Sequence, residues 1–347
     1  MARYEGLIPV NLLTGSLGSG KTTLLQQLLN SPQFAKTAVL VNEFGEIGLD
    51  HLLLERVDDD IVLLQTGCVC CTIRGELSDA MRDLYERRQR GHIPAFERLA
   101  IETTGLADPA PIIFTLSADP VLRHHFRLSN VITTVDGVNG ELQLDANTET
   151  AKQVAVADRI VVTKTDIAEQ ANLVGLAARL ADLNPAAAIV LAPSQRIEPN
   201  VLMANDVYNP TSKSQEVQNW LVMEAESRHR NGGHHSSRHD AEISSFCVTY
   251  DAPLNWTAFG LWLSMLLNCH GEQVLRVKGI LDVDGMPGPV VIHGVQHLVH
   301  PPVHLDRWPS EDHRSRIVFI VRGLEHDLVE RSLAAFNGLV NPYQCAA

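Results

Sequence analysis

Residues 15–22 read G-S-L-G-S-G-K-T; they follow an apolar run, residues 8–13, and precede a leucine-rich helical pattern, residues 22–29. Strand, glycine-rich loop and helix in this order form the pattern G-x-x-x-x-G-K-[ST], whose backbone N–H groups surround nucleotide phosphates. Its lysine pairs with the β- and γ-phosphates, its last hydroxyl holds Mg²⁺, and the helix directs its positive end at the anion. An ordinary glycine-rich turn would not need these flanking elements. We therefore predict a nucleoside triphosphate site formed by Gly15, Gly18, Ser19, Gly20, Lys21, Thr22 and Thr23.

The composition bounds the class of protein. The chain has 347 residues, 45% of them hydrophobic, which is enough for two cores. Its 28 basic and 41 acidic side chains give a net charge of −13, which repels nucleic acids and anionic membrane surfaces. No apolar run reaches the length of a membrane span, and the N-terminal stretch leads into the phosphate loop rather than a cleavage site. We expect a cytoplasmic protein with no nucleic-acid or membrane partner.

The order of apolar runs predicts two domains joined by a linker. In residues 1–195 short apolar runs alternate with helical patterns, which predicts an α/β domain with a doubly wound, mostly parallel sheet. Residues 196–241 are polar and end in a histidine-rich stretch, which indicates a linker. Residues 242–347 predict a smaller α+β domain. We expect strands at 8–13, 37–42, 61–65, 98–102, 129–135, 158–163, 187–191, 243–250, 274–283, 290–299 and 316–322, and late helices at 254–267 and 326–337.

The stretch I-V-V-T-K-T-D, residues 160–166, places a [NT]-K-x-D pattern at the end of a buried strand. A carboxylate at its last position accepts the N1–H and exocyclic N–H of guanine, whereas adenine offers no matching pair of donors. A site that hydrogen-bonds one group can reject an analogue lacking it by about 10⁴-fold. Thr163, Lys164 and Asp166 are therefore predicted to select GTP over ATP.

Two further loops combine carboxylates with glycines after an apolar strand: N-E-F-G-E-I-G-L-D at 42–50 and I-E-T-T-G-L-A-D-P at 101–109. Ligands of open α/β sheets bind at strand ends, so both are predicted to sense the γ-phosphate and its Mg²⁺. Glu102 would orient a magnesium-bound water, Gly105 would sense the γ-phosphate through its N–H, and Asp50 would position the attacking water. Taken singly, each carboxylate is as well explained as a cap. The predicted catalytic residues are Lys21, Asp50, Glu102 and Gly105, and the predicted Mg²⁺ ligands are Thr22 and Glu102.

Three of the six cysteines, Cys68, Cys70 and Cys71, lie between the strand at 61–65 and a helical pattern at 72–90. A helix N-terminus stabilises thiolates, the form that binds Zn²⁺. Their spacing discourages mutual disulfides, so we expect reduced, metal-binding thiols. Three thiolates leave a fourth position for a carboxylate, a histidine, water or a receiving protein. Buried apolar cysteines and a redox pair are the alternatives.

Histidines form two further groups, and such clusters bind divalent ions. The linker group is predicted to be a low-affinity loading arm or a solvated polar segment. In the second group, His293 and His297 are expected to share one strand face with His300 opposite, and the group is expected to be structural. The linker group comprises His229, His234, His235 and His239, and the second group His293, His297, His300 and His304.

The motifs G-S-L-G-S-G-K-T, N-E-F-G-E-I-G-L-D, G-C-V-C-C, E-T-T-G-L-A-D-P and T-K-T-D resemble, in this order, those of the CobW-like metallochaperone GTPases, relatives of HypB and UreG. The resemblance covers the chain to about residue 195, and R-V-K-G-I-L and S-R-I-V-F-I-V-R-G look like the family's C-terminal domain. It implies a GTPase that binds Zn²⁺ or Co²⁺ at the C-x-C-C cysteines and delivers the metal to a client metalloenzyme. It also makes Glu43 and Glu46 candidate fourth ligands.

The resemblance further implies that GTP binding and hydrolysis switch the metal site. We hypothesise that GTP favours the metal-holding state and that hydrolysis releases the metal. The relation to HypB makes a nucleotide-dependent homodimer plausible. Thr163 stands where many GTPases have Asn, and Val41 stands where some relatives carry an acidic residue. Zinc is the expected cargo and cobalt the alternative. A zinc-buffering GTP-binding module and a thiol redox-sensing GTPase are the competing functions.

Overall fold

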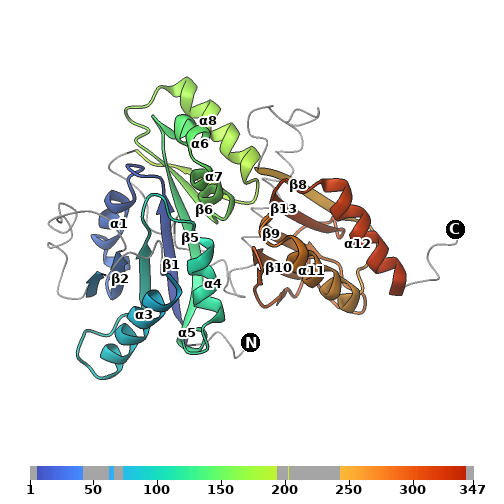
Figure 1. Cartoon of the computed structure of the whole chain (residues 1–347), viewed down its shortest axis with the longest axis horizontal. Coiled ribbons are helices and arrows are strands. Elements are labelled where there is room, and N and C mark those ends of the chain that lie inside the picture. The colour runs from blue at the N-terminus through green and yellow to red at the C-terminus, as the bar shows by residue number, and fades with distance from the viewer. Residues whose placement is uncertain (1–5, 42–61, 66–72, 194–201, 203–242, 341–347) are drawn as a thin grey trace. The chain divides into compact units, whose positions relative to one another are not determined.

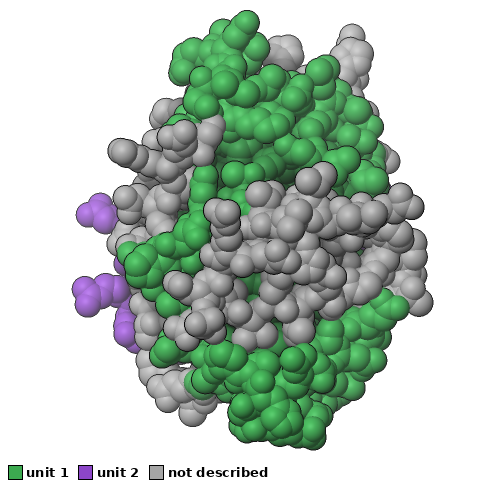
Figure 2. All heavy atoms as spheres, turned by 90° about the vertical axis from the view of Figure 1, so that its left-hand side faces the viewer, with its two compact units in different colours: residues 1–180, 187–209 green, residues 181–186, 210–347 purple. Residues whose placement is uncertain are grey.

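The computed structural model places the chain in two units, each with its own sheet and hydrophobic core. Unit 1 comprises residues 1–180 and 187–209, and unit 2 comprises residues 181–186 and 210–347; the described residues of the two units are green and purple in Figure 2. The residues that the structure describes are 6–41, 62–65, 73–193, 202 and 243–340.

The described part of unit 1 forms a seven-stranded parallel sheet with the order β3-β2-β4-β1-β5-β6-β7 (Figure 1). The chain moves outward from β1 to β3, returns through β4 and then continues on the other side of β1. Ligands of such sheets bind where the direction reverses, outside the carboxyl ends of the strands. Each expected strand in this unit is confirmed. The strands are β1 (Ile8–Gly15), β2 (Thr37–Val41), β3 (Val62–Gln65), β4 (Arg98–Glu102), β5 (Phe126–Asp136), β6 (Arg159–Thr163) and β7 (Ala188–Leu191).

Helix α1 (Lys21–Leu29) covers one face of this sheet. Its leucines pack on Leu13, Val39, Ala100 and Ile132, which come from four neighbouring strands. Side chains alternate along a strand, so every second residue of these strands belongs to this face.

Among the described helices, none is both long and apolar enough to cross a membrane. The other helical segments that begin in unit 1 are η1 (Pro32–Phe34), α3 (Ile73–Gln89), α4 (Ala110–Ala118), α5 (Leu122–His125), α6 (Gly140–Ala146), α7 (Thr148–Ala155) and α8 (Gln170–Leu183).

Residues 243–340 of unit 2 form a six-stranded antiparallel sheet with the order β11-β10-β9-β13-β8, and β12 pairs with β10. Trp262 of α11 packs in the core with Phe319 of β13, and its indole N–H donates to Ser332 of α12 at 2.9 Å. This bond joins the two helices over the sheet's apolar side chains. The elements are β8 (Ile243–Tyr250), α11 (Trp256–His270), β9 (Val274–Leu281), β10 (Val290–Val295), β11 (Leu298–Val299), β12 (Val303–His304), β13 (Ser315–Arg322) and α12 (His326–Val340).

The single strand expected at 290–299 is wrong, because these residues form a hairpin of β10 and β11. Gln296 adopts a φ of 49° in the turn. The turn interrupts the alternation of side chains, so the expected placing of the histidines is wrong too. The backbone N–H of His300 donates to the carbonyl of His293 at 2.9 Å, and both side chains are buried. His297 instead lies with Nδ1 2.9 Å from the carbonyl oxygen of Leu267.

Candidate functional site

The phosphate loop between β1 and α1 packs tightly against β5. Lys21 is 5% exposed, and its Nζ donates to the carbonyls of Gly15 and Ser16, each at 3.0 Å. Gly15 has a φ of 141°, and a Cβ there would collide with Thr134. Ser19 Oγ lies 2.6 Å from Thr134 Oγ1. Contacts with Thr134 of the central strand β5 thus hold the loop in place.

The start of α1 presents backbone donors to this loop. The N-cap residue is Gly20, which has no side chain to accept from the N–H groups of the first turn. Those groups, with the positive end of the helix dipole, favour an anion at this point. Lys21 begins the helix, Thr22 is partly buried and Thr23 is exposed. The structure therefore brings the residues predicted from the G-x-x-x-x-G-K-[ST] pattern together at one helix N-terminus.

Thr22 and Glu102 meet beside the phosphate loop. Thr22 Oγ1 donates to Glu102 Oε1 at 2.6 Å, and Glu102 is 1% exposed. Glu102 ends β4 two residues after Ala100, so it lies on the same sheet face as α1. Mg²⁺ prefers hard oxygen ligands, and P-loop proteins hold it through a loop hydroxyl and a strand-end carboxylate. This pair of oxygen donors fits the ion.

The loop after β4 lies against the phosphate loop. The N–H of Thr103 donates to the carbonyl of Leu13 at 2.9 Å, and Thr103 Oγ1 donates to Thr14 Oγ1 at 2.8 Å. A Cβ on Gly105 would lie 2.5 Å from the nitrogen and 2.7 Å from the Cα of Leu17. Because real Cβ atoms do not approach other atoms this closely, a larger residue at Gly105 would push the two loops apart.

The loop after β6 is tied to the phosphate loop by one side chain. Thr163 Oγ1 lies 2.8 Å from the carbonyl oxygen of Ser19 and 3.2 Å from that of Val135. Asp166 follows in an exposed position. A residue of the predicted base-reading pattern therefore contacts a residue of the predicted phosphate-binding pattern.

Asp136, at the end of β5, holds Lys164 and is not among the residues predicted from the sequence. Lys164 Nζ lies 2.7 Å from Asp136 Oδ2, and the lysine backbone has a φ of 55°. Burial disfavours the charged carboxylate, but hydrogen bonds from Lys164, Val138 and Asn139 outweigh it and hold the pKa of Asp136 below its usual range. The signal was available, because Asp136 directly follows the apolar run expected at 129–135, just as Glu102 is the last residue of its own strand.

Three neighbouring strands, β3, β2 and β4, end at the same level at this edge of the sheet, and β1 continues two residues further, to Gly15. In the parallel register Val41 of β2 pairs with Gln65 of β3 on one side and with Glu102 of β4 on the other. Glu102 pairs in turn with Leu13 of β1. The predicted metal loop, both predicted switch loops and the phosphate loop therefore all start from one row of strand ends.

Several predicted site residues lie outside the described residues. Their neighbours are described: β2 ends at Val41, β3 ends at Gln65 and α3 begins at Ile73. The thiol motif thus comes directly before a helix start in the chain, as expected. The residues concerned are Glu43, Glu46, Asp50, Cys68, Cys70 and Cys71, together with the linker histidines His229, His234, His235 and His239.

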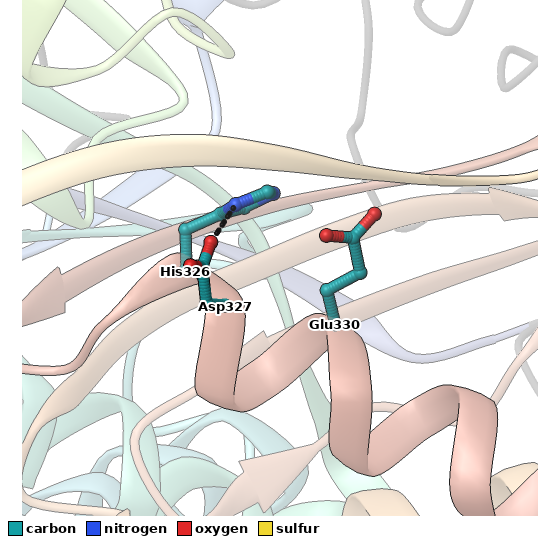
Figure 3. Close-up of side chains that lie close together, drawn as sticks. All are labelled: His326, Asp327 and Glu330. Atoms are coloured by element: carbon teal, nitrogen blue, oxygen red, sulfur yellow. Dashed lines mark hydrogen bonds and ion pairs between the residues drawn. The ribbon is translucent and has the colours of Figure 1, made fainter.

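One group of three metal-ligating side chains occurs among the described residues, at the start of α12 (Figure 3). The donor atoms of His326, Asp327 and Glu330 lie within 4.8 Å of one another, and His326 Nδ1 is 3.3 Å from Asp327 Oδ1. Both carboxylates are exposed. Asp327 lies in the first turn, where an acidic side chain stabilises the helix through its dipole, and exposed acidic groups such as Glu330 commonly occur without an ion.

The fold and these contacts define a P-loop nucleotide-binding domain followed by a separate antiparallel α+β unit. Sequence families agree: residues 9–191 match the CobW/HypB/UreG nucleotide-binding domain, and residues 243–337 match the cobalamin synthesis protein cobW C-terminal domain. The chain belongs to this CobW family. The resemblance inferred from the five motifs and the expected fold class are both confirmed.

Named relatives align over nearly the whole chain. The zinc chaperone YjiA of Escherichia coli K12 is 36% identical over 333 residues, which cover 96% of this chain and 98% of YjiA. The zinc chaperone CobW of a Sinorhizobium species is 28% identical, over 97% and 98% of the two chains. The crystal structure of Zn(II)-bound YjiA GTPase from E. coli has a TM-score of 0.73 at 31% identity, over 95% of this chain and 99% of that chain. The similarity therefore extends to both units.

Proposed function

We propose that this protein is a Mg²⁺-dependent GTPase that binds zinc at Cys68, Cys70 and Cys71 and transfers it to a client apo-metalloenzyme. The observation that carries the nucleotide part is the 2.6 Å contact between Thr22 and Glu102 beside the phosphate loop. Family membership supports the zinc part, because relatives aligned over the full chain are named zinc chaperones.

The nucleotide would be held by the residues around α1. Lys21 pairs with the β- and γ-phosphates, and Thr22 and Glu102 would hold Mg²⁺. The ion, when bound, neutralises charge on the β- and γ-phosphate oxygens. Gly105 would direct its N–H at the γ-phosphate and Asp50 would position the attacking water. Each of these roles is a proposal supported by the described contacts or, for Asp50, by sequence alone.

The base would be selected by the loop after β6. Asp166 would accept two N–H donors of guanine, while Thr163 ties this loop to the phosphate loop through the Ser19 carbonyl. The ion pair of Lys164 with Asp136 holds the lysine of the pattern in place. Base and phosphate recognition would therefore be fixed relative to each other.

The cargo metal would bind at the thiols, with Glu43 or Glu46 as a candidate fourth ligand. The chain enters α3 at Ile73, two residues after Cys71, so the positive helix end would favour thiolates. Three thiolates suit zinc, and Co²⁺ accepts similar sites. GTP would favour the metal-holding state and hydrolysis would release the metal to the client.

Turnover measurements test this proposal. We would strip metal from the protein with a chelator, supply Mg²⁺ and GTP, and titrate Zn²⁺ or Co²⁺ into wild type and Cys70→Ser. Cys269→Ser is the matched control, since Cys269 is an exposed free cysteine in unit 2. A metal-dependent change in turnover that is lost only in Cys70→Ser supports the proposal. A flat response with intact zinc binding would favour a zinc buffer, and loss of activity on oxidation of metal-free protein would favour a redox sensor.

A nucleotide-dependent homodimer belongs to the same proposal. Sedimentation velocity in GDP and in a non-hydrolysable GTP analogue would measure the mass in each state. A monomer in both would remove dimerisation from the cycle and leave the zinc and GTP parts standing.

A further inference from the structure

A buried glutamine in α7 holds the loop after β4. Gln153 is fully buried, and its Nε2 donates to the carbonyl of Ala107 at 2.9 Å and to that of Gly105 at 3.2 Å. Both N–H groups of one side-chain amide therefore go to this loop. A fork of two hydrogen bonds fixes direction as well as distance, which a single bond does not.

The helix that carries Gln153 is itself anchored to the sheet and to the phosphate loop. Thr133 Oγ1 of β5 donates to the backbone carbonyl of Gln153 at 2.7 Å. Thr150 Oγ1, one turn earlier, lies 2.7 Å from Ser16 Oγ in the phosphate loop. Helix α7 thus contacts both the phosphate loop and the loop after β4, and the position of the helix influences the positions of these loops.

A third link joins α7 to the same loop at the protein surface. Lys152 Nζ lies 3.8 Å from Asp108 Oδ2, with 21% and 29% of the two side chains exposed. At 3.8 Å the two charges are too far apart for a hydrogen bond, so the amide of Gln153 is the principal tie. The hydrogen bonds of Gln153 matter because they hold Gly105 close to the backbone of Leu17, in a space too small for any side chain at position 105.

We propose that Gln153 is a positioning residue for nucleotide hydrolysis, because its amide fixes Gly105 against the phosphate loop where the γ-phosphate would be sensed. The inference rests on the proposed GTPase function. Because GDP lacks the γ-phosphate that Gly105 would sense, loss of the Gln153 amide is expected to weaken binding of GTP and not that of GDP. The contribution of Gln153 should therefore appear as a difference between the affinities for GTP and for GDP, rather than as a general loss of nucleotide binding.

The test compares Gln153→Met with Thr37→Val. The first replaces the amide with an apolar chain of similar length. The second removes a buried hydrogen bond in the same unit, from Thr37 Oγ1 to the carbonyl of Phe34, and this bond involves neither α7 nor the loop after β4. We would measure kcat and KM for GTP, and the Kd of GDP and of guanosine 5′-[β,γ-imido]triphosphate. For Gln153→Met we expect kcat to fall by roughly 10- to 100-fold, the range for misplacing a group by about 1 Å. The Kd of the analogue should rise about tenfold while that of GDP stays within about twofold, and kcat and both Kd values should stay near those of wild type in Thr37→Val.

Several results would overturn the inference. If Gln153→Met lowers thermal stability but keeps the wild-type ratio of the two affinities and the wild-type kcat, Gln153 is structural. If wild type binds neither guanine nucleotide, the proposed function fails, and this outcome is distinct because it appears before any substitution. Should Gln153→Met not fold, hydrogen exchange on wild type decides: the analogue, but not GDP, must protect residues 103–108 and α7 together. Protection of the loop without α7 would refute the role of Gln153.

Discussion

Replacing Gly105 with alanine tests the contact between the two loops most directly. The new Cβ would lie 2.5 Å from the backbone nitrogen of Leu17, whereas ordinary contact begins at 3.4 Å. One loop must therefore move by about 0.9 Å, and the neighbouring atoms are backbone, which cannot rotate away. Thr103 is hydrogen-bonded to Leu13 and Thr14, and Gln153 donates a hydrogen bond to the carbonyl of Gly105 itself. Moving the loop would therefore strain or break these bonds.

The expected cost follows from this displacement. Overpacking of a well-packed site costs about 1–3 kcal/mol of unfolding free energy. A displacement near 1 Å in a catalytic loop lowers turnover by roughly 10²-fold. We therefore expect Gly105→Ala to lose most GTP turnover and to unfold at lower urea concentration, while GDP still binds. Urea unfolding, steady-state GTP hydrolysis and GDP titration measure these three quantities.

Gly175→Ala is the matched control, because it makes the same chemical change in the same unit. Gly175 lies on the exposed side of α8, and a Cβ there would meet nothing closer than Glu141 Oε1 at 3.9 Å. Alanine in a helix is favoured over glycine by about 0.5–1 kcal/mol, so this variant should be slightly more stable and fully active. The reasoning is refuted if Gly105→Ala behaves like Gly175→Ala in stability and turnover.

Two further predictions concern ion pairs in unit 1. Burial raises the pKa of Asp119, but hydrogen bonds from Ser78, two backbone N–H groups and Arg82 lower it to about 2. The charged carboxylate therefore contributes about 2 kcal/mol to the free energy of unfolding. This contribution is present above pH ~4 and is lost as the pH falls towards 2. The free energy of unfolding of Asp119→Asn should therefore lie below wild type at pH 7 and converge with it in urea titrations near pH 2; a pH-independent gap contradicts this. Lys164→Met leaves the buried Asp136 carboxylate without its cation and should lower the free energy of unfolding by roughly 1–2 kcal/mol. This is less than for a fully buried pair, because the Lys164 side chain is 36% exposed. Additive effects of Lys164→Met and Asp136→Asn on unfolding, in a double-mutant cycle, would show that the pair is not coupled.

The central strands of the unit 1 sheet were predictable because their residues are buried on both faces, as in β1, β4 and β6. Such strands read as nearly continuous apolar runs, which stand out from the helical patterns between them. Residues at strand ends were predictable for the same reason. Glu102 follows an apolar strand, and parallel strands end at one edge, so its meeting with Thr22 could be expected from the motif order. Asp136 obeys the same rule and could have been found with it.

The role of Gln153 could not be read from the sequence. Its partners are two backbone carbonyls in a loop 46 and 48 residues away, and carbonyls leave no signature in the residue types. A glutamine in the helical stretch A-K-Q-V-A is equally typical of an exposed helix face. Only the packing of α7 behind the two loops shows that this side chain is buried and what it holds.

The hairpin at 290–299 escaped prediction for a different reason. The stretch V-V-I-H-G-V-Q-H-L-V contains no Asn-Gly, Asp-Gly or proline signal at the turn, and Gln296 takes the left-handed conformation that glycine usually supplies. Pairing of Gly294 with Val299 and of Val295 with Leu298 stabilises the turn once the strand reaches the sheet. Tertiary pairing therefore overrides the local preference there, and with it the expected faces of the histidines.

The row of strand ends explains why zinc and nucleotide can influence each other in the proposed cycle. Neighbouring strands lie about 4.8 Å apart, so the ends of β3 and β4, with β2 between them, are separated by roughly 10 Å. Loops that start this close share backbone neighbours, and order imposed on one restricts the next. Thermodynamic linkage then fixes the size of the effect in both directions: if the GTP state binds zinc tenfold more tightly than the GDP state, zinc must raise the affinity for GTP over GDP tenfold, a coupling of about 1.4 kcal/mol. Measuring either ratio therefore predicts the other, and a disagreement between them would show that the zinc bound in the assay is not at the site that senses the nucleotide.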